Sequence, residues 1–213
     1  MRVDSETIFA AVAQQRREIA DVIDELDEKQ LATQSLCSGW DIKTVAAHVV
    51  SVFADGFWVF MRTAARHASM ARAIDDLARR RARSPVTEIT DTLRRRADHP
   101  LSPPLFGPLD PLADILIHTC DIYIPLGLPF APDPQQAALA LDFLTGPWPF
   151  GFVPAGRLRG LSLYATDADQ TWRKGPQIRG TARALIMCVA GRDVLAHELD
   201  GPGLALLRQR SGW

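Results

Sequence analysis

Residues 110–121 read DPLADILIHTCD, and this stretch interrupts an apolar helix with polar side chains at regular intervals. The Asp-Pro pair at its beginning is typical of a helix start, because the acid can cap free amides and proline lacks an N–H that would need a partner. Asp114, His118 and Asp121 follow at spacings of four and three residues, so they share one face of the predicted helix. Burying such groups costs several kcal/mol unless they are partnered. The pattern therefore predicts that they meet each other, or a shared ligand, inside a helical bundle.

A second histidine interrupts an apolar helix nearer the N-terminus. We expect a helix from Ile42 to about residue 68, starting after Asp41, whose carboxylate can accept hydrogen bonds from the free amides of the first turn. His48 has Val45 three positions before it and Val52 four positions after it, so its ring is predicted to point into the apolar face. Two helices thus each direct a histidine toward a bundle interior.

The remaining pattern predicts a mainly α protein, a four-helix bundle followed by a small C-terminal α/β domain. Cap signals and apolar spacing predict further helices over about 5–26, two within 69–99 that are separated at residues 84–85, and one over about 134–144. After residues 146–151 the period changes to two. There we expect a strand over 161–165, a hairpin from 171–173 and 177–179, a helix over 182–189, a strand over 194–199 and a helix over 204–210. The predicted domains are 1–147 for the bundle with its metal site, 148–156 for a linker and 157–213 for the α/β domain.

Composition excludes several classes of protein. The 213 residues are 47% hydrophobic and 23% charged with a formal net charge of −1, so the chain can bury a core and lacks the bias of disordered segments. No sequence-wide positive balance favours nucleic acid, and we interpret the arginine runs 79–83 and 94–96 as solvated helix faces. The acidic N-terminus does not resemble a signal peptide, and the longest apolar stretch, 45–60, is too short and polar for a bilayer. The sequence predicts a cytoplasmic protein, a monomer or homodimer, with no nucleic-acid or membrane partner.

His48, Asp114 and His118 make a plausible metal-ligand set. Two imidazoles and one carboxylate leave a fourth coordination position open, which is the arrangement of a catalytic zinc, and ferrous iron uses the same ligand types. The spacing Asp-x-x-x-His lets two side chains of one helix converge on one ion. In the alternative interpretation, His48 is a core histidine bonded to a carbonyl, and Asp114 and His118 pair only with each other.

At this point the sequence resembles the mycothiol-dependent maleylpyruvate isomerase family of the DinB-like metal-binding superfamily. The resemblance extends over nearly the whole chain as scattered short motifs. They are Trp40-Asp41, Val45-Ala46-Ala47-His48-Val49, Asp114-x-x-x-His118-x-x-Asp121, Pro125-Leu126-Gly127, Leu163-Tyr164-Ala165-Thr166-Asp167, Gly175-Pro176, Gly180-Thr181-Ala182 and Gly191-Arg192.

The resemblance implies a DinB-like four-helix bundle with a small C-terminal α/β domain, and His48, Asp114 and His118 as ligands of a divalent metal, with zinc as the first choice. The family more often has Glu where this chain has Asp114. The implied partners are mycothiol as cosubstrate and a small electrophilic substrate. In the isomerase reaction the thiolate adds to an activated cis double bond, permits rotation and leaves, and related members transfer the thiol to other electrophiles.

The thiol is expected to come from the cosubstrate, because Cys37, Cys120 and Cys188 all fall outside the predicted ligand stripe. Cys120 is about 200° around the helix from His118, so we interpret it as a small core residue. No phosphate-binding glycine loop and no nucleophile elbow is present. Two functions other than a thiol-dependent isomerase or transferase stay open: a metal-dependent hydrolase and a non-catalytic small-molecule binder.

Four more residues are candidates for supporting roles. Asp121 is predicted either to orient a ligand imidazole or to pair with an arginine at the end of the helix. Arg192, Arg173 and Arg179 have the chemistry to clamp a substrate carboxylate, with ordinary surface arginines as the alternative.

Overall fold

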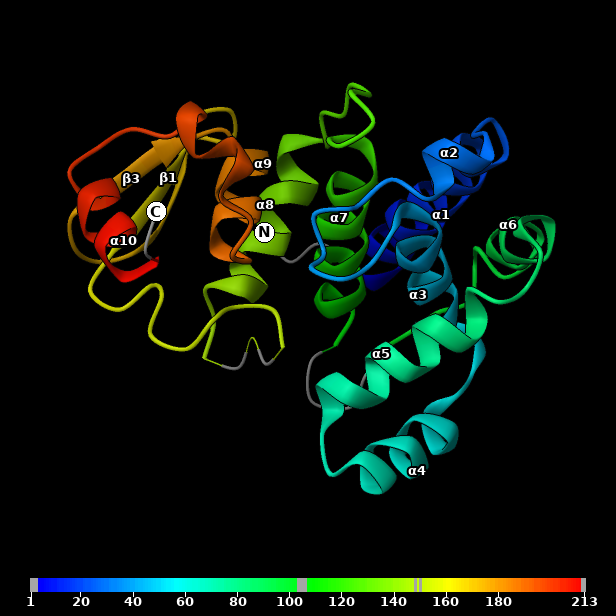
Figure 1. Cartoon of the computed structure of the whole chain (residues 1–213). Coiled ribbons are helices and arrows are strands. Elements are labelled where there is room, and N and C mark those ends of the chain that lie inside the picture. The colour runs from blue at the N-terminus through cyan, green and yellow to red at the C-terminus, as the bar shows by residue number, and fades with distance from the viewer. Residues whose placement is uncertain (1–3, 103–106, 148, 150, 212–213) are drawn as a thin grey trace. The chain divides into compact units, whose positions relative to one another are not determined.

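A computed structural model describes residues 4–102, 107–147, 149 and 151–211 of the chain (Figure 1). It is mainly helical and carries one small sheet of three strands within these residues. The elements are α1 (Ser5–Asp24), α2 (Glu28–Leu31), α3 (Ile42–Ala54), α4 (Phe57–His67), α5 (Met70–Arg81), α6 (Val86–Arg95), α7 (Leu109–Tyr123), α8 (Pro134–Leu144), β1 (Ser162–Ala165), β2 (Gln170–Arg173), β3 (Gln177–Gly180), α9 (Ala182–Val189), the 3-10 helix η1 (Asp193–Glu198) and α10 (Gly203–Ser211).

The chain divides into two compact units. The first contains Met1–Leu101 and His118–Phe130, and the second contains Ser102–Ile117 and Ala131–Trp213. The division falls inside α7, which is one continuous helix over Leu109–Tyr123. The predicted bundle over 1–147 also included α8, whereas in the structure α8 belongs to the second unit because it packs against α9. The linker proposed at 148–156 stays a prediction, and its residues 148 and 150 lie outside the described residues.

Two helices of the first unit begin at cap residues that the sequence predicts. The Asp4 side chain accepts a hydrogen bond from the Glu6 amide at the start of α1, and the Asp41 side chain accepts one from the Thr44 amide at the start of α3. Because these side chains pair amides that have no partner within the helix, they fix where each helix begins. α1 then packs against α6, and α3 packs against α5, burying the apolar stripe of each helix. α5 also packs against α4, as Figure 1 shows.

The single helix predicted over 42–68 is wrong. Asp55 caps the end of α3, and Gly56, at φ +81°, precedes α4, so the two helices meet at a bend of 118°. A φ in this region suits glycine and breaks a helix, whereas the apolar periodicity on both sides of the break is continuous. No single described helix is long and apolar enough to cross a membrane, although α3 and α4 reach that length and composition together across their bend.

Arg16 is a buried cation inside the first unit and gives a test of its packing. Its Nη1 donates to the carbonyls of Ala97 and His99 at 2.8 and 2.9 Å, and its guanidinium lies 4.2 Å from the centre of the Phe53 ring. We expect Arg16→Ala to lower the free energy of unfolding by about 2–4 kcal/mol, because it leaves two carbonyls without their charged donor and removes a cation–π contact. Denaturant titration followed by circular dichroism measures this loss.

Arg17 supplies the matched control for that prediction. It follows on the same helix, but its side chain is 45% exposed and pairs with the exposed Asp98. Surface ion pairs contribute little, so Arg17→Ala is expected to cost less than about 1 kcal/mol. Equal losses in the two variants would mean that the buried arginine does not stabilise the contact of α1 with residues 97–99.

The sheet of the second unit has the order β2-β1-β3. β1 pairs antiparallel with β2 and parallel with β3, so the predicted hairpin between residues 171–173 and 177–179 is wrong. The chain instead turns tightly between β1 and β2, where Asp169 has φ +48°. Gly175 then crosses so near the backbone of Gly160 that an added Cβ would meet the Gly160 carbonyl oxygen at 2.2 Å. This close crossing delivers β3 to the far side of β1.

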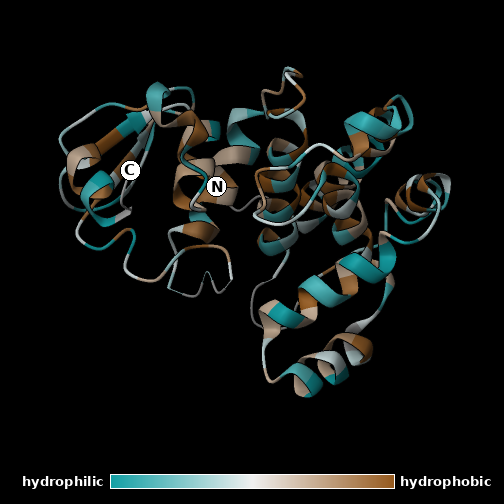
Figure 2. Cartoon of the chain, viewed as in Figure 1, coloured by the Kyte–Doolittle hydropathy of each residue, from teal (hydrophilic) through white to brown (hydrophobic). Residues whose placement is uncertain are grey.

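α9 covers this unit with the apolar spacing read from the sequence. It is almost fully buried and packs on α8, η1 and the strands β1 and β3. Figure 2 shows α9 mostly in the hydrophobic colour, in contrast to the charged helix α5. The strand predicted over 194–199 is wrong, because η1 covers Asp193–Glu198 and ends at Leu199. The strand-like pairing comes one residue later, as an isolated bridge between Arg179 and Asp200.

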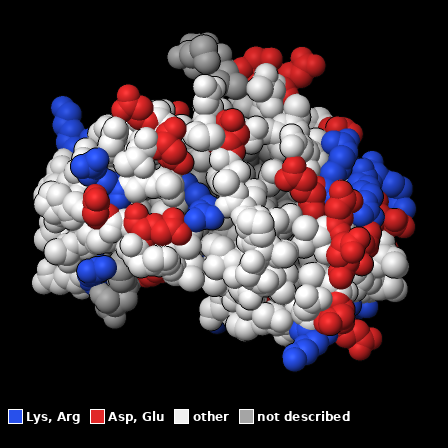
Figure 3. Space-filling view, turned by 90° about the horizontal axis from the view of Figure 1, so that it is seen from above, with Lys and Arg blue, Asp and Glu red and all other residues white. Residues whose placement is uncertain are grey.

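Most arginines of the two runs pair with neighbouring acids. Arg94 pairs with Asp21 and Asp24 across α6 and α1, and the edge where these helices lie shows acidic and basic side chains next to each other (Figure 3). The other run is paired in the same way, through Arg79–Asp75, Arg80–Asp76 and Arg81–Asp55. Paired arginines leave little net positive potential for a phosphate backbone, in agreement with their interpretation as helix faces.

Candidate functional site

The two histidines of the prediction meet in the first unit. His48 on α3 and His118 on α7 are 5% and 7% exposed, and the centres of their rings lie 4.7 Å apart with the planes at 78°. α3 turns His48 inward because the valines on either side of it, Val45 and Val49, are buried in the core. The hydrophobic pattern of α3 thus places an imidazole where water is excluded.

Asp114 completes a group of three possible ligands. It lies one turn before His118 on the continuous helix α7, and it is half-buried. His48, Asp114 and His118 each offer one ligand atom, and these three atoms lie within 4.8 Å of one another. The structure therefore brings together the three residues that the sequence suggested as ligands. Two imidazoles and a carboxylate at this separation are a donor set that suits zinc.

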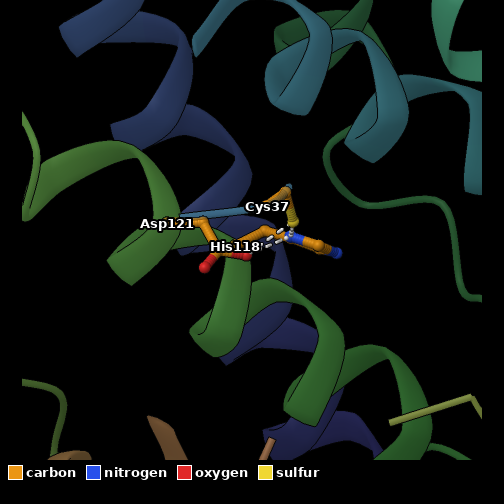
Figure 4. Close-up of side chains that lie close together, drawn as sticks. All are labelled: Cys37, His118 and Asp121. Carbon is orange, nitrogen blue, oxygen red and sulfur yellow. Dashed lines mark hydrogen bonds and ion pairs between the residues drawn. The ribbon is translucent and has the colours of Figure 1, made fainter. Parts of the chain in front are cut away.

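The other face of His118 contacts two further residues. His118 Nδ1 lies 2.9 Å from Oδ2 of Asp121, and the Cys37 thiol donates to the same oxygen at 3.1 Å. Cys37 Sγ is 3.9 Å from His118 Nδ1. Figure 4 shows Cys37, His118 and Asp121 converging from the segment before α3 and from α7. An Nδ1 that faces a carboxylate leaves the imidazole Nε2 as the nitrogen for a ligand, which is the usual arrangement of metal-bound histidines.

Cys37 lies outside the helical stripe of ligands but approaches His118 from a loop. It is half-buried, whereas Cys120 and Cys188 are buried. Its proximity could not be read from helix periodicity, because it lies in a loop that α7 meets only in the folded chain. One signal was present: Cys37 stands three residues before Trp40, in the segment that caps the helix carrying His48.

Asp110, in the first turn of α7, has an unusually high pKa. Burial, together with the charge of Asp114, raises the pKa of Asp110 to about 7. The folded protein therefore holds this proton more tightly than the unfolded chain, whose aspartates titrate near pH 4. As a result, the wild-type free energy of unfolding falls as pH rises from about 4 to about 7 through this group.

We expect Asp110→Asn to remove that fall, because an amide does not ionise. The free energy of unfolding of the variant relative to wild type should increase from pH 5 to pH 7 and level off above pH 8. Denaturant titrations of both proteins in the presence of a chelator measure it at pH 5, 6, 7 and 8. A difference that stays constant over this range contradicts a raised pKa at this position.

The three arginine candidates each make local contacts. Arg192 Nη1 donates to the Ala190 carbonyl, and Arg173 Nη1 donates to the Thr145 carbonyl. Arg179 lies over the Tyr164 ring at 5.5 Å. Arg173 also lines a surface pocket of about 350 Å³ in the second unit, together with Arg157 and Arg159. A role for any of the three in substrate binding stays a prediction.

Residues 12–105 match the family model described as the mycothiol maleylpyruvate isomerase N-terminal domain. These residues are similar to that domain. The predicted resemblance to that isomerase family is confirmed, and the matched part of the isomerase domain contains Cys37 and His48 but ends before α7. A search of curated proteins finds no match.

Two solved structures share the fold over most of the chain. One is a histidine-to-alanine variant of the mycothiol-dependent maleylpyruvate isomerase, with a TM-score of 0.59 and 13% identity over 94% of this chain and 93% of that chain. The other is the unsubstituted isomerase, with a TM-score of 0.57 and 12% identity over the same shares. This likeness confirms the predicted fold class, a mainly helical protein with a small α/β part.

Proposed function

We propose that the chain is a divalent-metal-binding enzyme that uses mycothiol to isomerise a small electrophile, or to transfer the thiol to it. The observation that carries this proposal is the convergence of His48, Asp114 and His118 within 4.8 Å. The isomerase N-terminal domain over residues 12–105 adds the thiol and the substrate class, because relatives with this fold are described as mycothiol-dependent maleylpyruvate isomerases.

The residues present fit a metal ion. Both histidines are more than nine-tenths buried, and their rings meet edge to face beside a carboxylate. We propose zinc, which these three donor types hold with one coordination position open. When bound, such an ion favours the charged form of a thiol and so supplies a thiolate nucleophile at neutral pH.

The residues of the chain contribute position and exclusion of water. His48 and His118 hold their imidazoles in the core, where the surrounding side chains keep bulk water away. Asp121 accepts from the Nδ1 side of His118, which leaves Nε2 as the nitrogen for a ligand.

The decisive experiment is turnover by the purified zinc-loaded protein with mycothiol and a panel of electrophiles that includes maleylpyruvate. The proposal expects consumption only when mycothiol is present, and its loss in His118→Ala. Thiol-independent hydrolysis of esters or amides would instead establish a metal-dependent hydrolase. Zinc retained without turnover in either assay would overturn the enzymatic proposal in favour of a small-molecule binder. His99→Ala, which removes an exposed histidine of the same unit, is the control.

A further inference from the structure

The segment before α3, residues 34–41, is a loop held by its own hydrogen bonds. The side-chain Nε2 of Gln34 donates to the backbone carbonyls of Ser35, Cys37 and Trp40. The Ser35 hydroxyl donates to the Trp40 carbonyl at 2.7 Å and accepts from the Cys37 amide at 3.1 Å. These bonds close a tight turn in which Gly39 has φ +77°. The loop therefore presents Cys37 in a fixed position.

The loop is also joined to α7 at one residue. The Leu36 amide donates to the backbone carbonyl of Asp121 at 3.3 Å, and the next residue, Cys37, donates its thiol to the Asp121 carboxylate. Asp121 is fully buried, with 0% of its surface exposed. A buried carboxylate requires donors, and both Cys37 and the Nδ1 side of His118 address its Oδ2 atom. Two donors on one oxygen fix the plane of the carboxylate and, through it, the ring of His118.

The same loop contacts the other histidine. The Trp40 ring lies 5.0 Å from the His48 ring, centre to centre, and its Nε1 donates to Asp75 at 2.7 Å. Arg79 adds a hydrogen bond to the Gly39 carbonyl at 2.9 Å. The loop 34–41 thus touches both imidazoles, one through Trp40 and one through Cys37 and Asp121.

We propose that Cys37 is a positioning residue: its thiol holds the Asp121 carboxylate, which in turn orients His118 for a ligand on Nε2. This inference rests on the proposed metal site and assigns a function to a residue outside its ligand set. Cys37 is absent from the group formed by His48, Asp114 and His118, and it lies on the Nδ1 side of the His118 ring. With His118 and Asp121 it forms a second group whose ligand atoms lie within 4.8 Å of one another, and in that group its thiol already donates to the Asp121 carboxylate. Its position therefore suits support of a ligand rather than ligation of the same ion or attack on a substrate.

Serine and alanine at this position separate the hydrogen bond from the volume of the side chain. Cys37→Ser keeps a donor for Asp121, whereas Cys37→Ala does not. We expect Cys37→Ala to weaken Zn²⁺ binding by about threefold to tenfold, less than the roughly 10- to 100-fold typical of a direct partner of a ligand. Cys37→Ser should stay within about twofold of wild type. Competition with a chromophoric chelator measures both, and Cys120→Ala, which removes a buried thiol of α7, should leave the affinity unchanged.

A second measurement needs no metal. In protein labelled with ¹⁵N-histidine and stripped of metal, the Nδ1-bound proton of His118, identified by its loss in His118→Ala, should exchange with water faster in Cys37→Ala than in wild type. Cys37→Ser should restore slow exchange, which a merely space-filling role would not do.

The outcomes separate this inference from the proposed metal site. If His48→Ala and His118→Ala bind Zn²⁺ as wild type does, the metal site itself is wrong. If those variants lose Zn²⁺ but Cys37→Ala changes neither affinity nor proton exchange, only the role of Cys37 is wrong. If Cys37→Ala abolishes binding as completely as His118→Ala does, Cys37 is a ligand and the positioning role is overturned.

Discussion

Purified wild-type protein is expected to bind one Zn²⁺ per chain, and His48→Ala or His118→Ala to weaken that binding on the order of 100-fold or more. Each substitution removes one of three donor atoms that lie within 4.8 Å of one another. A 100-fold loss corresponds to about 2.8 kcal/mol of binding free energy, which is a modest loss for the removal of one metal ligand. Elemental analysis gives the stoichiometry, and chelator competition gives the affinity.

His99→Ala and His197→Ala are the matched controls for this result. Both histidines are exposed, so the same substitution there tests whether loss of any imidazole lowers the zinc content. Circular dichroism establishes that each variant keeps its helices. Unchanged affinity in folded His48→Ala and His118→Ala would leave the three residues as a packed cluster without a metal, the alternative that the sequence also allowed.

The helices were predictable because their signals are local. Asp41 and Asp133 each cap the helix that follows them, and these caps are set by residues three or fewer positions apart. The break at Gly56 was missed because the apolar period continues through it, and only the positive φ ends α3. The order of the strands was missed for a different reason. β1 pairs with β3 although β2 stands between them in the sequence. No local pattern distinguishes that pairing from a hairpin of β2 and β3.

The residues of the candidate site that lie on helices were predictable, and the one that lies in a loop was not. Asp114, His118 and Asp121 follow from the geometry of one helix, because a spacing of three or four residues places side chains on one face. Their meeting with His48 required only that two apolar faces pack in one bundle. Cys37 lies in a loop, so no helical periodicity predicts where its side chain points. A hydrogen bond from the Leu36 amide to the Asp121 carbonyl joins that loop to α7 in the folded chain. Contacts between a loop and a helix of distant sequence depend on the tertiary fold alone.

Asp121→Ala is expected to weaken Zn²⁺ binding by about 10- to 100-fold, although Asp121 is no member of the group with His48 and Asp114. The substitution removes the acceptor 2.9 Å from His118 Nδ1, so the ring loses the partner that fixes its orientation and proton position. Asp121→Asn keeps an oxygen acceptor without the charge and should fall between alanine and wild type.

The graded series tests whether charge and geometry both act through His118. Chelator competition at one pH measures the three affinities, and Asp91→Ala, which removes an exposed carboxylate on α6, is the control for loss of a negative charge. Because Asp121 is fully buried, its loss also destabilises the fold, and thermal unfolding of the metal-free variants measures that cost separately. An Asp121→Ala protein that stays folded and binds Zn²⁺ as tightly as wild type would show that His118 is oriented by packing alone, and the carboxylate would then serve only to satisfy the buried thiol and imidazole.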